Sequence, residues 1–275
     1  MDFTLKRKIV HAGTGGNEFD DSKPVIMFIH GASMDHTIWA LQARYFAHHG
    51  YSVLAIDLPG HGASDGPALE SIEEMANWTA SIINATVKRP VILVGHSMGA
   101  IVALETAAQN PEKITAIALA GIAVPMTVNP KLLNQTVHKP LEAIDSIVGW
   151  AYSDRSQLGG TAVPGLWMLG GGRKLIERNA QGQLHVDFKA CNNYSHGLKS
   201  AANVKCPTLI IAGDDDKMTP PKASETLRRA LTHPTIEVIK GGGHMMMIER
   251  PDQTLETLKN FIATSATLES LNETN

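Results

Sequence analysis

The chain has 275 residues, of which 43% are hydrophobic and 19% charged, and its formal net charge is −3. This length and composition are ordinary for a globular protein with one large α/β domain or two small ones. The slight negative charge argues against a nucleic-acid partner, and the sequence has no basic run that would favour a membrane surface.

The cysteine content and the chain start indicate the compartment. Two cysteines, Cys191 and Cys206, are too few for a disulfide framework. The charged residues of Met1–Lys8 are not followed by the apolar stretch of a signal peptide. No apolar run approaches the roughly 18–20 residues of a membrane-spanning helix. We therefore expect a cytoplasmic protein that does not insert into membranes.

Short apolar runs alternate with amphipathic segments along most of the chain. Runs that are apolar on both faces predict parallel strands covered by helices on both sides. We expect strands at Val25–Ile29, Val53–Ile56, Val91–Val94, Ile114–Leu119, Thr208–Ala212 and Ile236–Ile239, with an antiparallel edge strand within Phe3–Val10. Helices are expected near Ile38–His48, Ile72–Val87, Ala100–Ala108, Lys222–Leu231 and Pro251–Ile262. The pattern predicts an α/β fold with a mostly parallel, doubly wound sheet.

One region departs from this alternation. Between about Pro125 and Ser200 no strand-like run recurs, and glycines, prolines and short helical patterns replace it. An insertion of this length is expected to form a helical cap over the carboxyl ends of the strands, where ligands bind in open α/β sheets. The expected organisation is a core of residues 1–124 and 201–264, a cap over 125–200, and a flexible tail over 265–275.

The segment Gly95-His96-Ser97-Met98-Gly99 carries the strongest functional signal. It follows the apolar run Val91–Val94 and precedes a helical pattern, which is the strand–turn–helix context of a nucleophile elbow. The turn holds its serine in a strained conformation, and the two glycines supply the required lack of bulk. Ser97 is therefore the candidate nucleophile.

Two later loops offer a base and an acid. His244 follows three glycines at the end of an expected strand, so its side chain can reach over the sheet edge toward Ser97. Asp214, Asp215 and Asp216 follow another strand, and one of them is expected to orient the imidazole. The residues alone do not choose among the three carboxylates.

Acyl transfer also needs two hydrogen-bond donors for the developing oxyanion. The backbone N–H of Met98, directly after the nucleophile, is one candidate. The N–H of Ala32, on the loop after Val25–Ile29, is the other. His30, at the exit of that strand, is expected to brace the loop by hydrogen bonding.

With these residues placed, the chain resembles the α/β-hydrolase superfamily in its serine-nucleophile branch with a helical cap, as in carboxylesterases and monoglyceride-lipase-like hydrolases. The motifs that carry the resemblance are His30-Gly31, Asp57-Leu58-Pro59-Gly60-His61-Gly62-Ala63-Ser64, Gly95–Gly99, Gly213-x-x-Asp216 and Gly243-His244. The resemblance implies that Asp216 is the acid of the triad. It also implies structural roles for Asp57 and His61, and a packing role for His96.

The expected activity is hydrolysis of a carboxylic ester through an acyl-enzyme, which requires neither a metal nor an organic cofactor. The expected partner is a small-molecule ester, and a homodimer is left open. Candidates for an apolar substrate pocket are Met34, Trp150, Trp167, Met168 and Met245, with Leu169 and Met246 beside them.

Two alternatives stay open. A carbon–carbon bond hydrolase or lactonase would use the same triad, with Arg155, Arg173 or Arg178 of the cap holding a carboxylate. A receptor that senses a small ligand and turns it over slowly would also retain the triad.

Overall fold

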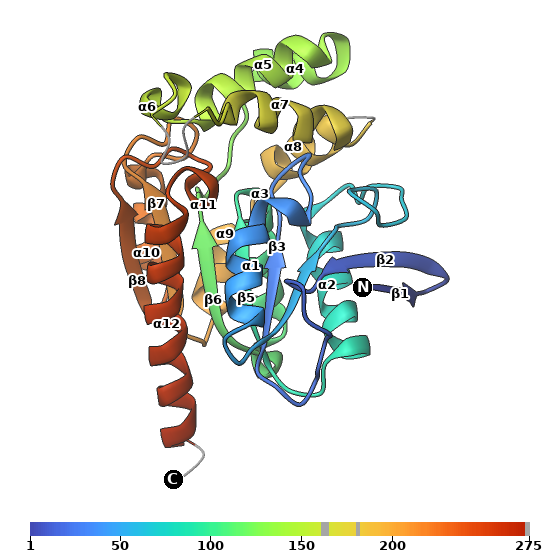
Figure 1. Cartoon of the computed structure of the whole chain (residues 1–275), viewed down its shortest axis with the longest axis vertical. Helices are drawn as coiled ribbons and strands as arrows, with labels where there is room; N and C mark the ends of the chain where they lie inside the picture. The colour runs from blue at the N-terminus through green and yellow to red at the C-terminus, as the bar shows by residue number, and fades with distance from the viewer. Residues whose placement is uncertain (161–164, 180–181, 273–275) are drawn as a thin grey trace.

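A computed structural model of the chain describes residues 1–160, 165–179 and 182–272 (Figure 1). Within these residues, eight strands form one sheet in the order β1-β2-β4-β3-β5-β6-β7-β8. All neighbouring strands from β4 to β8 are parallel, which confirms the predicted mostly parallel sheet. The strands are β1 (Asp2–Leu5), β2 (Lys8–Gly13), β3 (Val25–Ile29), β4 (Ser52–Ile56), β5 (Val91–His96), β6 (Ile114–Ala120), β7 (Thr208–Gly213) and β8 (Pro234–Ile239).

The N-terminal segment forms a hairpin instead of the single edge strand expected within Phe3–Val10. Strands β1 and β2 pair antiparallel, and β2 pairs antiparallel with β4. The turn between them places Lys6 and Arg7 at φ angles of 51° and 68°. Two-residue hairpin turns with positive φ usually contain Asn or Gly, so the Lys-Arg pair gave no turn signal.

Helices cover both faces of the sheet, as the alternation of apolar runs and helical segments predicts. Helices α2, α3, α9 and α10 contribute to one apolar cluster, while α1 and α12 contribute to the other. The core helices are α1 (Ala40–Ala47), α2 (Ile72–Thr86), α3 (Met98–Gln109), α9 (Gly197–Asn203), α10 (Glu225–Ala230), α11 (Met246–Glu249) and α12 (Pro251–Asn272), and short 3-10 turns are η1 (His36–Trp39), η2 (Pro111–Lys113) and η3 (Pro221–Ser224).

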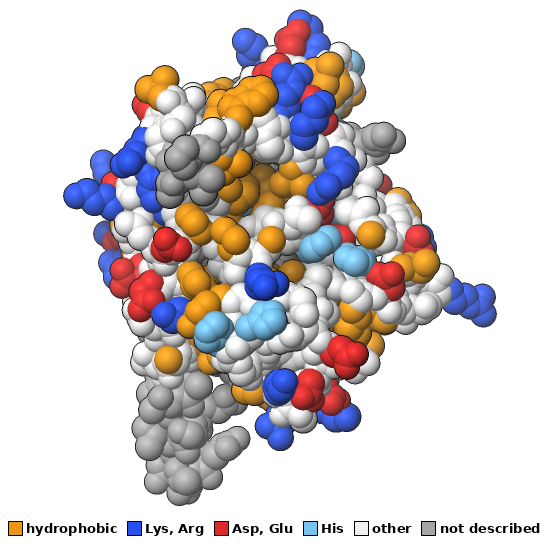
Figure 2. Space-filling model, viewed as in Figure 1, with side chains coloured by type: hydrophobic (Ala, Val, Ile, Leu, Met, Phe, Trp, Pro, Cys, Tyr) orange, Lys and Arg blue, Asp and Glu red, His pale blue; other side chains and the backbone are white. Residues whose placement is uncertain are grey.

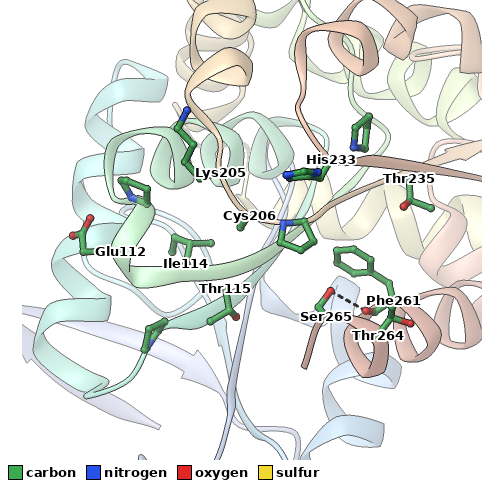
Figure 3. Close-up of a pocket in the computed structure, with 14 residues that line it drawn as sticks. Glu112, Ile114, Thr115, Lys205, Cys206, His233, Thr235, Phe261, Thr264 and Ser265 are labelled. Carbon is green, nitrogen blue, oxygen red and sulfur yellow. Dashed lines mark hydrogen bonds between the residues drawn. The ribbon is translucent and has the colours of Figure 1, made fainter. Parts of the chain in front are cut away.

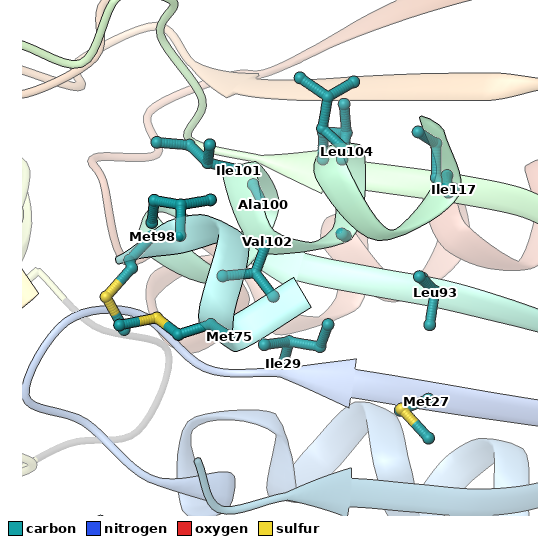
Figure 4. Close-up of a cluster of buried hydrophobic side chains, with 14 of the residues drawn as sticks. Met27, Ile29, Met75, Leu93, Met98, Ala100, Ile101, Val102, Leu104 and Ile117 are labelled. Carbon is teal, nitrogen blue, oxygen red and sulfur yellow. The ribbon is translucent and has the colours of Figure 1, made fainter. Parts of the chain in front are cut away.

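Strand side chains alternate between these two clusters, as the pleat of a strand requires. On β3, Met27 and Ile29 belong to the cluster under α3, whereas Phe28 belongs to the opposite cluster. Figure 4 shows the first cluster, where side chains of β3, β5 and β6 meet those of α2 and α3. The sheet is thus buried on both sides, and its carboxyl edge is left to form a site.

A layer of helices lies above that carboxyl edge (Figure 1). It is made of α4 (Pro130–His138), α5 (Pro140–Ala151), α6 (Asp154–Gln157), α7 (Met168–Asn179) and α8 (Gln183–Asn193). Helix α9 packs against α3 and α10, so the chain has returned to the core at Gly197, slightly before the expected boundary at residue 201.

The last helix is longer than expected. Helix α12 continues to Asn272, so residues 265–272 are helical where a flexible tail was expected. The physical reason is that this stretch has no glycine or proline to end the helix. Over the part of the chain that the structure describes, no helix has an apolar stretch long enough to cross a membrane.

The first turn of α3 lies directly against the end of β3. A Cβ atom added to Gly99 would lie 2.4 Å from the carbonyl oxygen of His30 and 2.5 Å from that of Ile29. Only a residue without a side chain permits this approach.

Two buried histidines stand at the carboxyl ends of β3 and β5. His30 donates from Nδ1 to the carbonyl oxygen of Gly31 (2.8 Å), and its Nε2 accepts the N–H of Leu58 (3.1 Å). These bonds brace the loop after β3, and they require a neutral ring because Nε2 must accept. His96 donates from Nε2 to the carbonyl oxygen of His244 (3.0 Å). Burial lowers the pKa of His30 to about 4 and that of His96 to about 3.

Replacing Gly99 by Ala should destabilise the fold strongly, because its Cβ would meet two backbone carbonyl groups. We expect a loss of about 3 kcal/mol or more in the free energy of unfolding, measured by urea titration. Gly149→Ala is the matched control, since Gly149 lies in α5 and a Cβ there would meet nothing within 4 Å. That control should gain about 0.5–1 kcal/mol. Equal effects at the two positions would contradict the close approach of α3 to β3.

Stability should fall as the pH decreases from about 6.5 toward 4. In this window the unfolded chain protonates its histidines near the ordinary pKa of 6.5, while His30 and His96 stay neutral in the folded state. Each histidine should account for a loss on the order of 3 kcal/mol at the acid end. Urea titrations between pH 7 and pH 4.5 measure this, and His96→Gln should show a shallower decline. If His96→Gln loses stability as steeply as the wild type, the ring of His96 is not held neutral.

Candidate active site

Ser97 stands on a sharp turn between β5 and α3. Its φ of 54° and ψ of −115° are unusual for a residue with a side chain, and such strain typically costs about 1–3 kcal/mol. A Cβ atom on Gly95 would lie 2.2 Å from the carbonyl oxygen of Gly99, so the tight turn needs both glycines. The turn therefore has the geometry of a nucleophile elbow.

His244 reaches the same region from the glycine turn after β8. Its Nδ1 lies 2.8 Å from Oδ2 of Asp216, and the N–H donates to that carboxylate. Its Nε2 is buried and has no hydrogen-bond partner among the described residues. Gly121 leaves room for the ring, since a Cβ there would lie 2.9 Å from Cε1 of His244.

Asp216 is held in its ionised form. Its side chain is fully buried, and it accepts hydrogen bonds from the hydroxyl of Thr219 (2.7 Å) and from the N–H groups of Met218 and Thr219 (2.8 Å each). Burial alone would raise the pKa of Asp216, but His244 and these hydrogen bonds together hold it well below its usual range. The carboxylate can thus orient His244 and stabilise its imidazolium.

The two neighbouring aspartates have other partners. Asp214 accepts the backbone N–H of Gly241 (2.6 Å), and Asp215 accepts the backbone N–H of Asp154 (2.9 Å). Of the three carboxylates that the residues alone did not separate, Asp216 is the one that contacts His244.

The backbone N–H groups of Met98 and Ala32 are the predicted donors of an oxyanion hole. Met98 is the first residue of α3, so its N–H has no acceptor within the helix. Ala32 belongs to the Gly31–Asp35 loop after β3 and lines the same cavity as Ser97. A serine, an imidazole with a free nitrogen and two N–H groups are together the parts of an acyl-transfer site.

The cavity above Ser97 has a volume of about 200 Å³ and lies between the strand ends and the cap. Its walls are mainly apolar side chains from the segment after β6 and from cap helices α4, α5 and α8. The lining residues are Ala32, Ser97, Met126, Thr127, Val128, Asn129, Leu132, Trp150, Phe188, Cys191, Lys217, Met218, Thr219 and His244.

Of the five residues expected to form the pocket, Trp150 lines this cavity. Met34 and Met245 are instead buried in the apolar cluster beneath the cap, because the core takes up apolar side chains as readily as a pocket does. Trp167 and Met168 line a separate hollow of about 450 Å³ between α7 and α11. In Figure 2, hydrophobic side chains gather in a hollow below the cap.

Sequence reasoning missed most of the cavity wall. Met126 and Val128 lie in the segment that joins β6 to α4, and their place after the carboxyl end of a strand was a usable signal. Phe188 and Cys191 lie three residues apart on α8, and this spacing puts both on one helix face.

The cap arginines that could hold a carboxylate lie elsewhere. Arg173 pairs with Asp145 and Glu177, and Arg178 pairs with Asp35. Neither these two nor Arg155 lines the cavity. The cation that does line it is Lys217, which pairs with Asp154.

One group of described residues has metal-ligand composition. His11, His36 and Asp57 each place one ligand atom within 4.8 Å of the others. However, the Asp57 carboxylate already accepts the backbone N–H groups of His36 (2.8 Å) and Ala63 (2.9 Å), which gives it a structural role. None of the three lines the cavity of Ser97.

A larger hollow, of about 830 Å³, lies at the opposite edge of the sheet (Figure 3). It is lined by residues where β6, β7 and β8 begin, among them Ile114, Pro207 and Pro234, and by Phe261 of α12. Ligands of open α/β sheets bind at the carboxyl ends of the strands, so we assign the functional site to the smaller cavity.

Comparisons with known proteins agree with this fold. Residues 26–257 match the alpha/beta hydrolase family. The (E)-2-((N-methylformamido)methylene)succinate hydrolase of Acinetobacter baylyi is 24% identical over 262 residues, which cover 90% of this chain and 93% of that protein. A solved thermophilic esterase is 26% identical with a TM-score of 0.80, covering 96% of this chain and 97% of its own.

The enol-lactonase of Burkholderia xenovorans LB400 is 19% identical with a TM-score of 0.84, covering 96% of this chain and 100% of its own, and this likeness concerns the fold. The esterase and the succinate hydrolase support hydrolysis as the kind of reaction. Because the family match spans most of the sequence and the sheet is mostly parallel, as predicted, the chain belongs to the alpha/beta hydrolase family.

Proposed function

We propose that the protein is a serine hydrolase that cleaves carboxylic esters with small to medium apolar acyl groups. One observation carries this proposal: the buried Nε2 of His244 has no partner among the described residues, in a cavity that Ser97 also lines. Its other ring nitrogen is bound to the ionised Asp216. The lone pair on Nε2 is therefore free to accept the proton of a hydroxyl group.

In the first half of the reaction, Nε2 of His244 takes the proton of the Ser97 hydroxyl, and Oγ forms a bond to the ester carbonyl carbon. The N–H groups of Met98 and Ala32 stabilise the oxyanion that develops on the carbonyl oxygen. The bond to the leaving alcohol then breaks, and the alcohol takes the proton from Nε2. An acyl group remains on Ser97.

The second half repeats these steps with water as the nucleophile. His244 takes a proton from water, whose oxygen attacks the acyl carbon, and then returns the proton to Ser97 Oγ as the acid is released. Asp216 stays ionised throughout because its pKa lies well below its usual range. It holds His244 in the tautomer with its free lone pair on Nε2.

The cavity wall favours an uncharged acyl group. Its apolar side chains, such as Leu132 and Phe188, gain contact with each methylene of a chain. A carboxylate, as in the substrate named for the Acinetobacter relative, would need a cation there. Lys217 is the cation that lines the cavity, and it is already paired with Asp154.

A series of p-nitrophenyl esters tests the reaction. For the wild type we expect kcat/KM to rise by about fourfold per methylene, the equivalent of about 0.8 kcal/mol, until the cavity is filled. Ser97→Ala should lower kcat by at least about 10⁴-fold. Ser146→Ala is the control, since Ser146 is a half-buried residue of α5 that does not line the cavity and should not affect turnover. If no ester of the series shows turnover that depends on Ser97, the proposal fails.

Substitutions of two tryptophans of the cap test where the acyl group of the substrate binds. Trp150→Ala removes a large side chain from the cavity wall. The enlarged cavity should move the preferred acyl group to longer chains by about two or more methylenes. Trp167→Ala changes a side chain that is 72% exposed and lines the other hollow, so the preference should stay unchanged. The same chain-length series measures both, and a shift with Trp167→Ala alone would place the acyl group in the outer hollow.

A further inference from the structure

One carboxylate of the cap reaches the loop that carries Ala32. Asp187 of α8 is fully buried, and its Oδ2 accepts the backbone N–H of Ser33 at 2.7 Å. Ser33 follows Ala32 in the Gly31–Asp35 loop. This bond therefore fixes the plane of the peptide group that joins Ala32 to Ser33, which adjoins the peptide group that carries the Ala32 N–H.

The loop needs such a restraint. Ser33 has a φ of 53°, in the left-handed region that residues with a side chain seldom adopt. Its hydroxyl is buried and has no hydrogen-bond partner among the described residues. Its side chain therefore supplies no bond that would fix the loop, whereas its N–H group is held by Asp187.

The charge of Asp187 is balanced on the other side. His61 Nε2 lies 2.8 Å from the same Oδ2, and both side chains are at most 1% exposed. His61 Nδ1 lies 3.1 Å from the carbonyl oxygen of Pro59, so both ring nitrogens face acceptors. Burial alone would lower the pKa of His61, but Asp187 raises it above its ordinary value. The pair is thus an imidazolium and a carboxylate that clamp the cap to the core.

The same helix also forms part of the cavity wall. Phe188 and Cys191 line the cavity from α8, one and four residues after Asp187. We propose that Asp187 is a positioning residue that orients the Ala32 N–H toward the oxyanion. This inference rests on the proposed function. The cap would then contribute to the chemical step as well as to the pocket.

The test compares kcat with KM. Asp187→Ala should lower kcat by about 10- to 100-fold, because the loop is released but the Ala32 donor is still present, and a lost donor costs about 10²–10³. KM for the best p-nitrophenyl ester should stay within about twofold. A boronic acid that forms a tetrahedral adduct on Ser97 should bind more weakly by the same factor as kcat falls.

Two further variants separate positioning from cap docking. Asp187→Asn keeps one oxygen that can accept both the Ser33 N–H and the Nε2–H of a neutral His61, so it should recover kcat to within about threefold of the wild type. Gln183→Ala removes another bond from α8 to the core, made by Nε2 to the carbonyl oxygen of Gly60 (2.7 Å), without touching the loop. It should leave kcat unchanged.

A measurement that does not need turnover completes the design. Hydrogen exchange of a peptide spanning Gly31–Asp35 should become at least about tenfold faster in Asp187→Ala, while a peptide from β5 stays protected. If wild-type turnover depends on Ser97 but Asp187→Ala behaves like Gln183→Ala, or loses activity through KM alone, the positioning role is overturned and the proposed function stands. If no Ser97-dependent turnover exists, the proposed function fails. Exchange of the loop then decides whether Asp187 holds it.

Discussion

At the turn between β5 and α3 the backbone passes so close to itself and to β3 that no side chain fits at Gly95 or Gly99, two positions before and after Ser97. The absent side chains of Gly95 and Gly99 let the first turn of α3 settle on the end of β3. Because of this approach, Ser97 and Ala32 of the loop after β3 line one small cavity. His244, which also lines that cavity, follows β8, and its partner Asp216 follows β7; both strands run parallel to β5 in the same sheet.

The parts that depend on local residue pattern could be predicted from the sequence. Apolar runs identified every parallel strand, and glycine spacing singled out Ser97 and His244. The sequence did not predict the hairpin turn at Lys6 and Arg7, because lysine and arginine seldom adopt the positive φ angles that this turn requires. Asp216 could be separated from its two neighbours only by resemblance. All three follow the same strand, and what distinguishes Asp216 is its bonds in space to Thr219 and His244.

The substrate cavity was the least predictable feature, for a physical reason. A methionine or tryptophan in a cap fills a core, a pocket or a surface hollow with the same chemistry, and composition does not distinguish these places. Met245 is buried in the core, Trp167 lies on the surface and Trp150 lines the cavity. What separates them is the packing of cap helices against strand ends, and that packing joins residues far apart in the chain.

The buried pair of Asp187 and His61 bears on how such enzymes diversify. Here the cap supplies one charge of an ion pair whose other half belongs to the core, and it also bonds to Ser33. A foreign cap grafted onto this core would leave a buried imidazole and a strained loop without their partner, unless it brought a carboxylate to the same place. Cap and core of this chain must therefore change together, which limits the recombinations that evolution or protein engineering can use.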